Sequence, residues 1–309
     1  MKSGISSGWT TEIPYDRFQE FIATDAERYQ ILLERIETLR LNSAVFQVKG
    51  NSHIFIFPRA QQSIRSSKGV FPFRGQSPIM LSAHYDRVEG SPGANDNSAA
   101  VFHLLKTASI LDQWNLDNWM VVFTDKEELK EGEGVAEQGS FSLAEKLRDW
   151  GLENARIFIF DACGVGDTFI ISSTSDHIMK NRESPGAIKA RQLIRQLRDH
   201  ALNTARNLNL SKILLAPTPF SDDAGFLRAG FPAQTITMLP SKESGAYGAL
   251  LRSRPEFADI LITGTANNPT EHRLIPETWR TLNGPNDKFI RLTPQFYGQV
   301  IRFAVELCR

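Results

Sequence analysis

The fold is decided at residues 79–86, which read Ile-Met-Leu-Ser-Ala-His-Tyr-Asp. A short, largely apolar run is followed directly by a histidine and, two positions later, by an aspartate. Such a run is typical of a strand that is buried on both faces of a sheet. Because ligands bind beyond the carboxyl ends of parallel strands, His84 and Asp86 stand where a functional site is expected.

Further strand-like runs alternate with helical stretches along the chain. The runs are 119–124, 155–161, 168–173, 213–216 and 233–239, and the helical stretches are 99–111, 143–150 and 187–208. Near-continuous apolar strands separated by helices favour a mostly parallel sheet covered by helices on both faces. We therefore predict an α/β fold.

The flanking regions give a weaker pattern. Apolar residues at helical spacing predict an N-terminal helix over about 15–41, and residues 46–58 read as two strands around a turn at 50–52. The late stretch of about 241–287 has mixed composition and is expected to form loops and a short helix over the site. No repeat or linker interrupts the sequence, so residues 1–309 are interpreted as a single domain.

The bulk composition excludes several classes of protein. The chain has 309 residues, of which 41% are hydrophobic and 23% charged, and 35 basic residues balance 35 acidic ones. Without a basic excess, nucleic acid is not expected as a partner. Residues 1–16 lack the apolar core of a signal peptide, no apolar run is long enough for a bilayer, and two cysteines cannot build a disulfide framework. We expect a soluble cytoplasmic protein without a membrane partner, and the oligomeric state stays open.

Acidic side chains gather at the predicted strand ends. Glu127 and Glu128 follow the strand 119–124, and Asp161 comes directly after four large apolar residues. Asp96 lies in a glycine-rich and proline-containing loop just before a helix. An isolated aspartate there is most often a helix cap, and paired glutamates are common on solvated faces. Together, however, these residues offer the oxygen and nitrogen ligands that suit zinc or a similar divalent ion.

The spacing assigns a role to each residue. A metal-bound imidazole needs its other ring nitrogen held, and Asp86 is placed to hold that of His84. Asp96 could bridge two metal ions from the mouth of its loop. Neighbouring residues in extended chain point to opposite sides, so one of Glu127 and Glu128 can bind metal while the other accepts a proton from water.

These residues resemble those of the co-catalytic zinc exopeptidases, which include bacterial leucyl aminopeptidases and, as a relative, glutaminyl cyclases. The resemblance runs from about residue 79 to residue 289, and five motifs occur in the family order. They are Ala83-His84-Tyr85-Asp86, Gly93-Ala94-Asn95-Asp96-Asn97, Asp125-Lys126-Glu127-Glu128 with Gly139-Ser140 after it, Asp161, and Phe220-Ser221-Asp222 leading to Ala229-Gly230-Phe231-Pro232.

The resemblance implies a three-layer α/β/α fold with a mixed, mostly parallel central sheet, and a metal site. By resemblance, His84, Asp96 and Asp161 hold one zinc ion. Asp96, Glu128 and a late histidine hold a second ion, and Glu127 is the general base, with Asp86 supporting the catalytic centre.

Two departures from the family stand out. Asn283 occupies the place of the late histidine, in the segment Thr281-Leu282-Asn283-Gly284-Pro285-Asn286-Asp287. An amide oxygen is a weaker zinc ligand than an imidazole nitrogen, so one or two zinc ions are both compatible with the sequence. His272 is the one other histidine in the late segment and the candidate for a substitute ligand. The second departure is Asp223, where the family often has a histidine.

Three functions remain open on these residues. The first is a metal-dependent hydrolase of the aminopeptidase type, in which zinc activates water, Glu127 is the general base, and the substrate is a peptide or an amino-acid derivative. The second is a single-zinc acyltransferase similar to the glutaminyl cyclases. The third is a non-catalytic binding protein that has kept a peptidase-like pocket.

Overall fold

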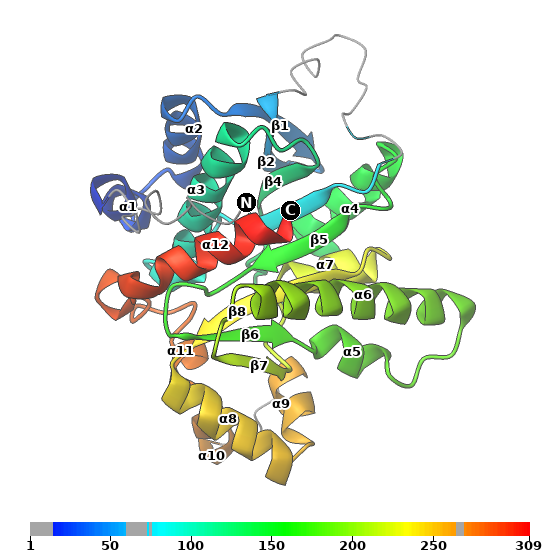
Figure 1. The fold of residues 1–309 in the computed structure, drawn as a ribbon. Coiled ribbons are helices and arrows are strands. Elements are labelled where there is room, and N and C mark those ends of the chain that lie inside the picture. The colour runs from blue at the N-terminus through cyan, green and yellow to red at the C-terminus, as the bar shows by residue number, and fades with distance from the viewer. Residues whose placement is uncertain (1–14, 60–72, 74–75, 264–268) are drawn as a thin grey trace.

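The computed structural model describes residues 15–59, 73, 76–263 and 269–309. Most of residues 1–16, for which the sequence predicts no signal peptide, lies outside the described residues. Its centre is an eight-stranded sheet with the order β1-β2-β4-β3-β5-β8-β6-β7 (Figure 1). The strands are β1 (Asn42–Val48), β2 (Asn51–Phe57), β3 (Ile79–His84), β4 (Trp119–Thr124), β5 (Arg156–Phe160), β6 (Thr168–Ser172), β7 (Ile213–Ala216) and β8 (Ala233–Leu239). Each strand predicted from the sequence is present, which confirms the α/β fold.

The strand directions make the sheet mixed but mostly parallel. Strands β4, β3, β5 and β8 run parallel to one another, and β6 and β7 are parallel to each other. The hairpin β1–β2 and the pairs β2–β4 and β6–β8 are antiparallel. Because the parallel strands are in register, with His84 opposite Thr124, their carboxyl ends meet at one edge.

Successive residues of the central strands face two different cores, because side chains alternate along a strand. Ile54, Leu81, Val121 and Phe158 face one core, and Phe55, Met80, Met120 and Ile157 face the other. All of these side chains are buried, and truncating a core phenylalanine costs about 3–5 kcal/mol. The sheet therefore holds the residues at the carboxyl ends of its parallel strands in fixed positions.

Helices cover both faces of the sheet (Figure 1). On one face lie α3 (Ala99–Gln113), α6 (Pro185–Asn207) and α12 (Tyr297–Leu307), and on the other lie α4 (Gly139–Asp149) and α7 (Asp222–Arg228). Shorter turns are η2 (Ala94–Ser98), η3 (Val135–Glu137), α5 (Thr174–Met179), η4 (Phe289–Arg291) and η5 (Pro294–Phe296). This arrangement is the predicted three-layer α/β/α fold. Among the described helices, none combines the length and the apolar character needed to cross a bilayer.

The N-terminal region differs from the single helix expected over about 15–41. It forms two helices, α1 (Tyr15–Ile22) and α2 (Arg28–Thr38), joined by a turn. Phe18 and Phe21 of α1 and Leu32 of α2 are all buried in the same core cluster as α3. The turn lets both helices bury their apolar faces in that cluster, which the helical periodicity alone does not reveal.

The stretch of about 241–287, expected to be loop-rich with one short helix, is largely helical. It contains α8 (Ser241–Ser253), α9 (Phe257–Thr263), α10 (Pro269–Leu274) and α11 (Glu277–Arg280). Tyr247, Phe257 and Trp279 from these helices form a third core cluster with Ile170 of β6 and Leu239 of β8. Tertiary packing against the end of the sheet stabilises short helices whose sequences give little signal alone.

Candidate metal centre and active site

The predicted site residues come from three strand ends and one loop. His84 is the last residue of β3, Glu127 and Glu128 follow β4, and Asp161 follows β5. Asp96 lies in η2, just before α3. Because these strands are parallel neighbours, the structure brings all five residues to one edge of the sheet.

Three side chains surround the His84 imidazole at short range. Its Nε2 lies 3.1 Å from Oδ1 of Asp96 and 3.8 Å from Oδ1 of Asp161. One ligand atom from each of His84, Asp96 and Glu128 lies within 4.8 Å of the other two. His84 is fully buried, and the Asp96 and Asp161 side chains are 7% and 15% exposed.

This donor set fits a divalent metal ion. Within the described part of the chain, His84 Nε2, Glu128 Oε1 and Asp161 Oδ1 are buried without a hydrogen-bond partner. Buried polar atoms are nearly always paired, and a cation bound between these atoms would satisfy all of them. One imidazole nitrogen with carboxylate oxygens is a ligand set that zinc accepts.

The loop that carries Asp96 is fixed by its two asparagine neighbours. Asn95 Oδ1 accepts the backbone N–H of Gly164 at 2.7 Å, and Asn97 Nδ2 donates to the Phe160 carbonyl at 2.8 Å. These partners lie on either side of Asp161, so Asp96 and Asp161 are held in one unit. Helix α3 begins at Ala99, and Asp96 lies within η2, two residues before Ser98, so Asp96 is not the residue that precedes the helix.

The carboxylates at this edge of the sheet repel one another unless a cation lies between them. Burial raises the pKa of Asp96 and Glu128, that of Glu128 to about 9, and Asp96 adds repulsion at Glu128. Burial lowers the pKa of His84, but contacts with Asp161, Asp86 and Asp96 outweigh this and raise it well above its ordinary value. A bound divalent ion inverts this balance, because it favours ionised carboxylates and a neutral imidazole.

Glu127 is positioned by a residue that the sequence motifs did not single out. Gln138 Nε2 donates to Glu127 Oε1 at 3.2 Å and to the Glu127 carbonyl at 3.3 Å. Burial raises the pKa of Glu127 well above its ordinary value, and the carboxylate of Glu128 adds to this. Gln138 directly precedes the Gly139-Ser140 motif, which is the one hint in the sequence that it belongs to the site.

The motif around Asp222 supports the site from the second face of the sheet. The Thr124 hydroxyl donates to Asp222 Oδ2, which ties the start of α7 to the end of β4. Burial raises the pKa of Asp222 to about 6 and that of Asp223 to about 7. Asp223 Oδ1 accepts the backbone N–H of Ser221 at 2.9 Å and is not among the residues that line the site.

A cavity of about 300 Å³ opens beside the predicted site residues. Asp96, Glu127, Glu128 and Asp161 line it, together with Trp279, Leu282 and Asn283 from the late segment. Asn283 therefore lies at the cavity, with a left-handed φ of 59° that asparagine tolerates well. His272 lies on α10, is exposed and does not line the cavity, so the structure does not support it as a substitute ligand.

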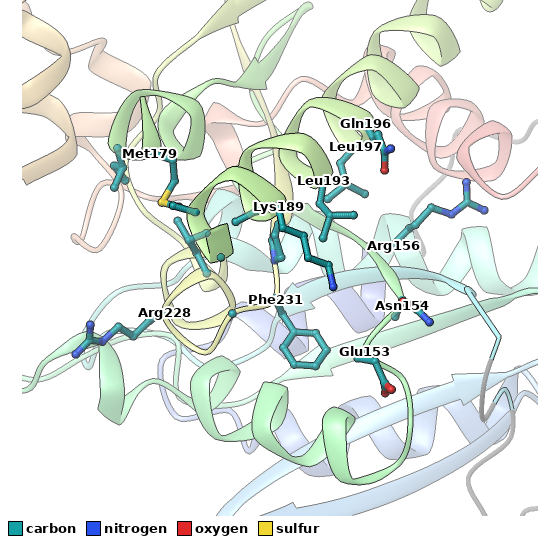
Figure 2. Close-up of a pocket in the computed structure, with 18 of the residues that line it drawn as sticks. Glu153, Asn154, Arg156, Met179, Lys189, Leu193, Gln196, Leu197, Arg228 and Phe231 are labelled. Carbon is teal, nitrogen blue, oxygen red and sulfur yellow. The ribbon is translucent and has the colours of Figure 1, made fainter. Parts of the chain in front are cut away.

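A larger hollow of about 1450 Å³ lies elsewhere and contains none of the predicted site residues (Figure 2). It lies between α6 and the segments that precede β5 and β8, and Lys189, Arg228 and Phe231 are among its lining residues. Arg156, also in its lining, begins β5, so this hollow includes the strand edge opposite to the metal-facing residues. Size alone does not mark the functional site here.

Solved structures with the same fold are zinc aminopeptidases and glutaminyl cyclases. A leucine aminopeptidase precursor from Bacteroides thetaiotaomicron is 14% identical, covers 97% of each chain and has a TM-score of 0.61. The Porphyromonas gingivalis glutaminyl cyclase is 15% identical, with 97% of each chain covered and a TM-score of 0.60. The zinc aminopeptidase BSAP from Bacillus subtilis is 15% identical, with a TM-score of 0.51. The match covers 83% of this chain and about half, 49%, of BSAP.

At these identities the likeness shows a shared fold. No curated protein matches the chain. Residues 69–273, however, match the model of peptidase family M28. Since that match spans more than half of the sequence, the chain belongs to peptidase family M28.

Proposed function

We propose that the protein is a zinc-dependent exopeptidase of the aminopeptidase type. The observation that carries this proposal is the convergence of His84, Asp96, Glu128 and Asp161 at one sheet edge, with Glu127 beside them on the same cavity. Family membership supports a metal-dependent hydrolase, and the buried unpaired ligand atoms support zinc at this edge.

In this proposal, His84, Asp96 and Asp161 hold one ion, and Asp96, Glu128 and Asn283 hold a weaker second ion. A bound zinc ion supplies positive charge that polarises the scissile carbonyl and promotes the loss of a proton from water. Asp86 keeps the His84 ring oriented, with 3.4 Å between its Oδ1 and the ring Nδ1.

Glu127 is the proposed general base. Its carboxylate lines the cavity, and the Gln138 amide fixes the orientation of Oε1. A raised pKa suits a group that must accept a proton from water and then deliver it to the leaving amine. Glu127 is thus assigned the transfer of the proton, while Glu128, its neighbour, faces the ligand cluster.

The cavity favours the free N-terminus of a peptide. The four carboxylates in its lining produce a negative potential that attracts an α-ammonium group. A volume of about 300 Å³ fits one residue rather than an extended chain that continues on both sides. Trp279, which is 6% exposed, and Leu282 add apolar surface to the lining for the side chain of that residue.

Asn283 favours a second candidate function, a single-zinc acyltransferase similar to the glutaminyl cyclases. In that reaction one zinc ion suffices, and the amine of the substrate itself is the nucleophile. Among the described residues, one group of side chains is close enough together to share a metal ion, and it consists of His84, Asp96 and Glu128. One such group is compatible with a single bound ion.

Metal analysis and two substrates separate these functions. The wild-type protein is expected to contain zinc and to release the chromophore from aminoacyl p-nitroanilides. If the protein cyclises an N-terminal glutaminyl peptide but does not hydrolyse p-nitroanilides, the acyltransferase function is the correct one. Zinc binding with neither reaction would identify a binding protein, and absence of zinc under metal-replete conditions would refute the metal centre.

A further inference from the structure

Arg28 connects the N-terminal helices to the candidate metal centre. It is the first residue of α2 and is 6% exposed. Its guanidinium donates to six acceptors, which are the carbonyls of Phe21 at 3.2 Å, Tyr85 at 3.2 Å, Asp86 at 3.1 Å, Pro92 at 2.8 Å and Gly93 at 3.2 Å, and the Ser98 hydroxyl at 2.9 Å. A guanidinium has five N–H donors, more than any other side chain, and the three contacts of Nη2 share its two N–H groups.

The acceptors belong to the two loops that present metal-facing residues. Tyr85 and Asp86 directly follow His84, while Pro92, Gly93 and Ser98 surround Asp96. One guanidinium therefore sets the position of these two loops relative to each other. A shift in either loop would break several charge-assisted hydrogen bonds at once.

The backbone of Gly93 is shaped to admit this guanidinium. Gly93 has a left-handed φ of 57°, and a Cβ atom at this position would lie 2.6 Å from both Arg28 Nη2 and the backbone oxygen of Asp96. Any side chain here would strain the backbone and collide with both atoms. Glycine at position 93 therefore leaves room for the Arg28 guanidinium as well as for the tight turn of its own loop.

Asp287 holds the same loop from the C-terminal side. Its Oδ1 accepts the backbone N–H of Asn95 at 2.8 Å, and its Oδ2 accepts that of Asp96 at 2.9 Å. Arg28 and Asp287 both lie outside residues 69–273, the part of the chain that matches the family model. The loop that carries Asp96 is therefore held by two residues that lie far from it in the sequence.

The charge of Arg28 also reduces repulsion within the site. Burial, with the nearby Arg87, lowers its pKa to about 9, and Asp86, Asp96 and Asp287 oppose this decrease. The guanidinium is thus a cation at neutral pH, behind a cluster of carboxylates. It offsets part of their mutual repulsion and keeps them close together before a metal ion binds.

We propose that Arg28 is a positioning residue that pre-forms the metal-binding loops, with Asp287 as its counterpart, so that α2 sets the metal affinity of the site. This inference rests on the metal centre of the proposed function. It predicts that residues 94–98 are ordered in the metal-free protein only when the guanidinium group of Arg28 is present.

The first test measures amide hydrogen exchange in the metal-free protein. Arg28→Lys keeps the charge but removes the guanidinium, and the amides of Asn95 and Asp96 are expected to exchange at least about tenfold faster. The matched control is Arg35→Lys, the same substitution in the last turn of the same helix, where Arg35 is partly exposed. In Arg35→Lys these amides should exchange as in the wild type, and equal rates in Arg28→Lys and wild type would overturn the proposal.

The second test measures zinc affinity by competition with a fluorescent chelator. Arg28→Lys should bind zinc about ten- to a hundredfold more weakly, and Arg35→Lys should match the wild type. If Arg28→Lys fails to fold, Ser98→Ala removes a single acceptor and should shift both readouts in the same direction by a smaller amount. A lower unfolding midpoint with unchanged zinc affinity would show that Arg28 is only structural.

The two tests separate this inference from the proposed function. If the wild type binds no zinc while amide exchange still depends on Arg28, the proposed function fails and the ordering of the loop by Arg28 stands. If the wild type binds zinc but the Arg28 variants change neither exchange nor affinity, the inference fails and the metal centre stands.

Discussion

Asp86 lies 3.4 Å from Nδ1 of the His84 imidazole, on the side opposite to Asp96. The same carboxylate accepts the backbone N–H groups of Glu127 at 3.2 Å and Glu128 at 3.0 Å. These bonds and His84 lower the pKa of Asp86, although burial acts in the opposite direction. One carboxylate thus orients the proposed imidazole ligand, the proposed base and a proposed carboxylate ligand together.

Replacing Asp86 is therefore expected to weaken metal binding without removing a ligand. In Asp86→Ala, zinc affinity should fall about 10–100-fold, because the His84 ring and the Glu127–Glu128 backbone both lose their support. The measurement is zinc competition with a chelator of known affinity. Asp117→Ala, an exposed aspartate just before β4, is the control and should bind zinc as the wild type does. Equal affinity in the two variants would contradict the role given to Asp86.

Glu127→Gln separates proton transfer from metal binding. The substitution keeps the size of the side chain and removes the basic carboxylate, so kcat should fall about 10²–10⁴-fold while zinc content stays the same. Glu131→Gln is the matched control, because Glu131 is an exposed glutamate in the same loop. Loss of zinc in Glu127→Gln would instead identify Glu127 as a ligand and leave the base unassigned.

Asn283→His restores the residue type that the family has at this place. The variant should bind a second zinc ion more tightly, because an imidazole nitrogen is a better zinc ligand than an amide oxygen. The left-handed backbone at Asn283 also accepts histidine, so strain should not mask the result. Zinc titration followed by calorimetry gives the stoichiometry, and an unchanged stoichiometry and affinity would place Asn283 outside the metal centre.

Asp223 should make the stability of the metal-free protein depend on pH. Burial raises its pKa from 3.8 to about 7, so the folded state binds a proton that the unfolded chain releases between these values. Stability from this group is present below pH 3.8 and is lost as pH rises through about 7. Asp223→Asn keeps an acceptor for the Ser221 N–H and removes the titration, so its stability relative to the wild type should rise across this window. Urea unfolding of both proteins between about pH 4 and about pH 8 tests this, and parallel curves would refute it.

The sheet could be predicted from the sequence because its central strands are buried on both faces. Each such strand is a largely apolar run, and the polar residues at or just after its end are conspicuous, as His84, Glu127 and Asp161 are. Their convergence follows from parallel pairing, since adjacent carboxyl ends must meet at one edge. The short helices between 241 and 287 could not be predicted, because packing against β6 and β8 stabilises them rather than their own periodicity.

The sequence by itself determined which side chains stand at the strand ends and which motif residue, Asn283, departs from the family. Only the tertiary structure showed how these side chains are held. Arg28 donates mainly to backbone carbonyls, and Asp287 accepts backbone N–H groups, which every residue type except proline offers. Such contacts leave no pattern in a sequence. The side chain that makes the contact is one particular residue, but its partner is a backbone group that nearly every residue has, and only folding brings the two together.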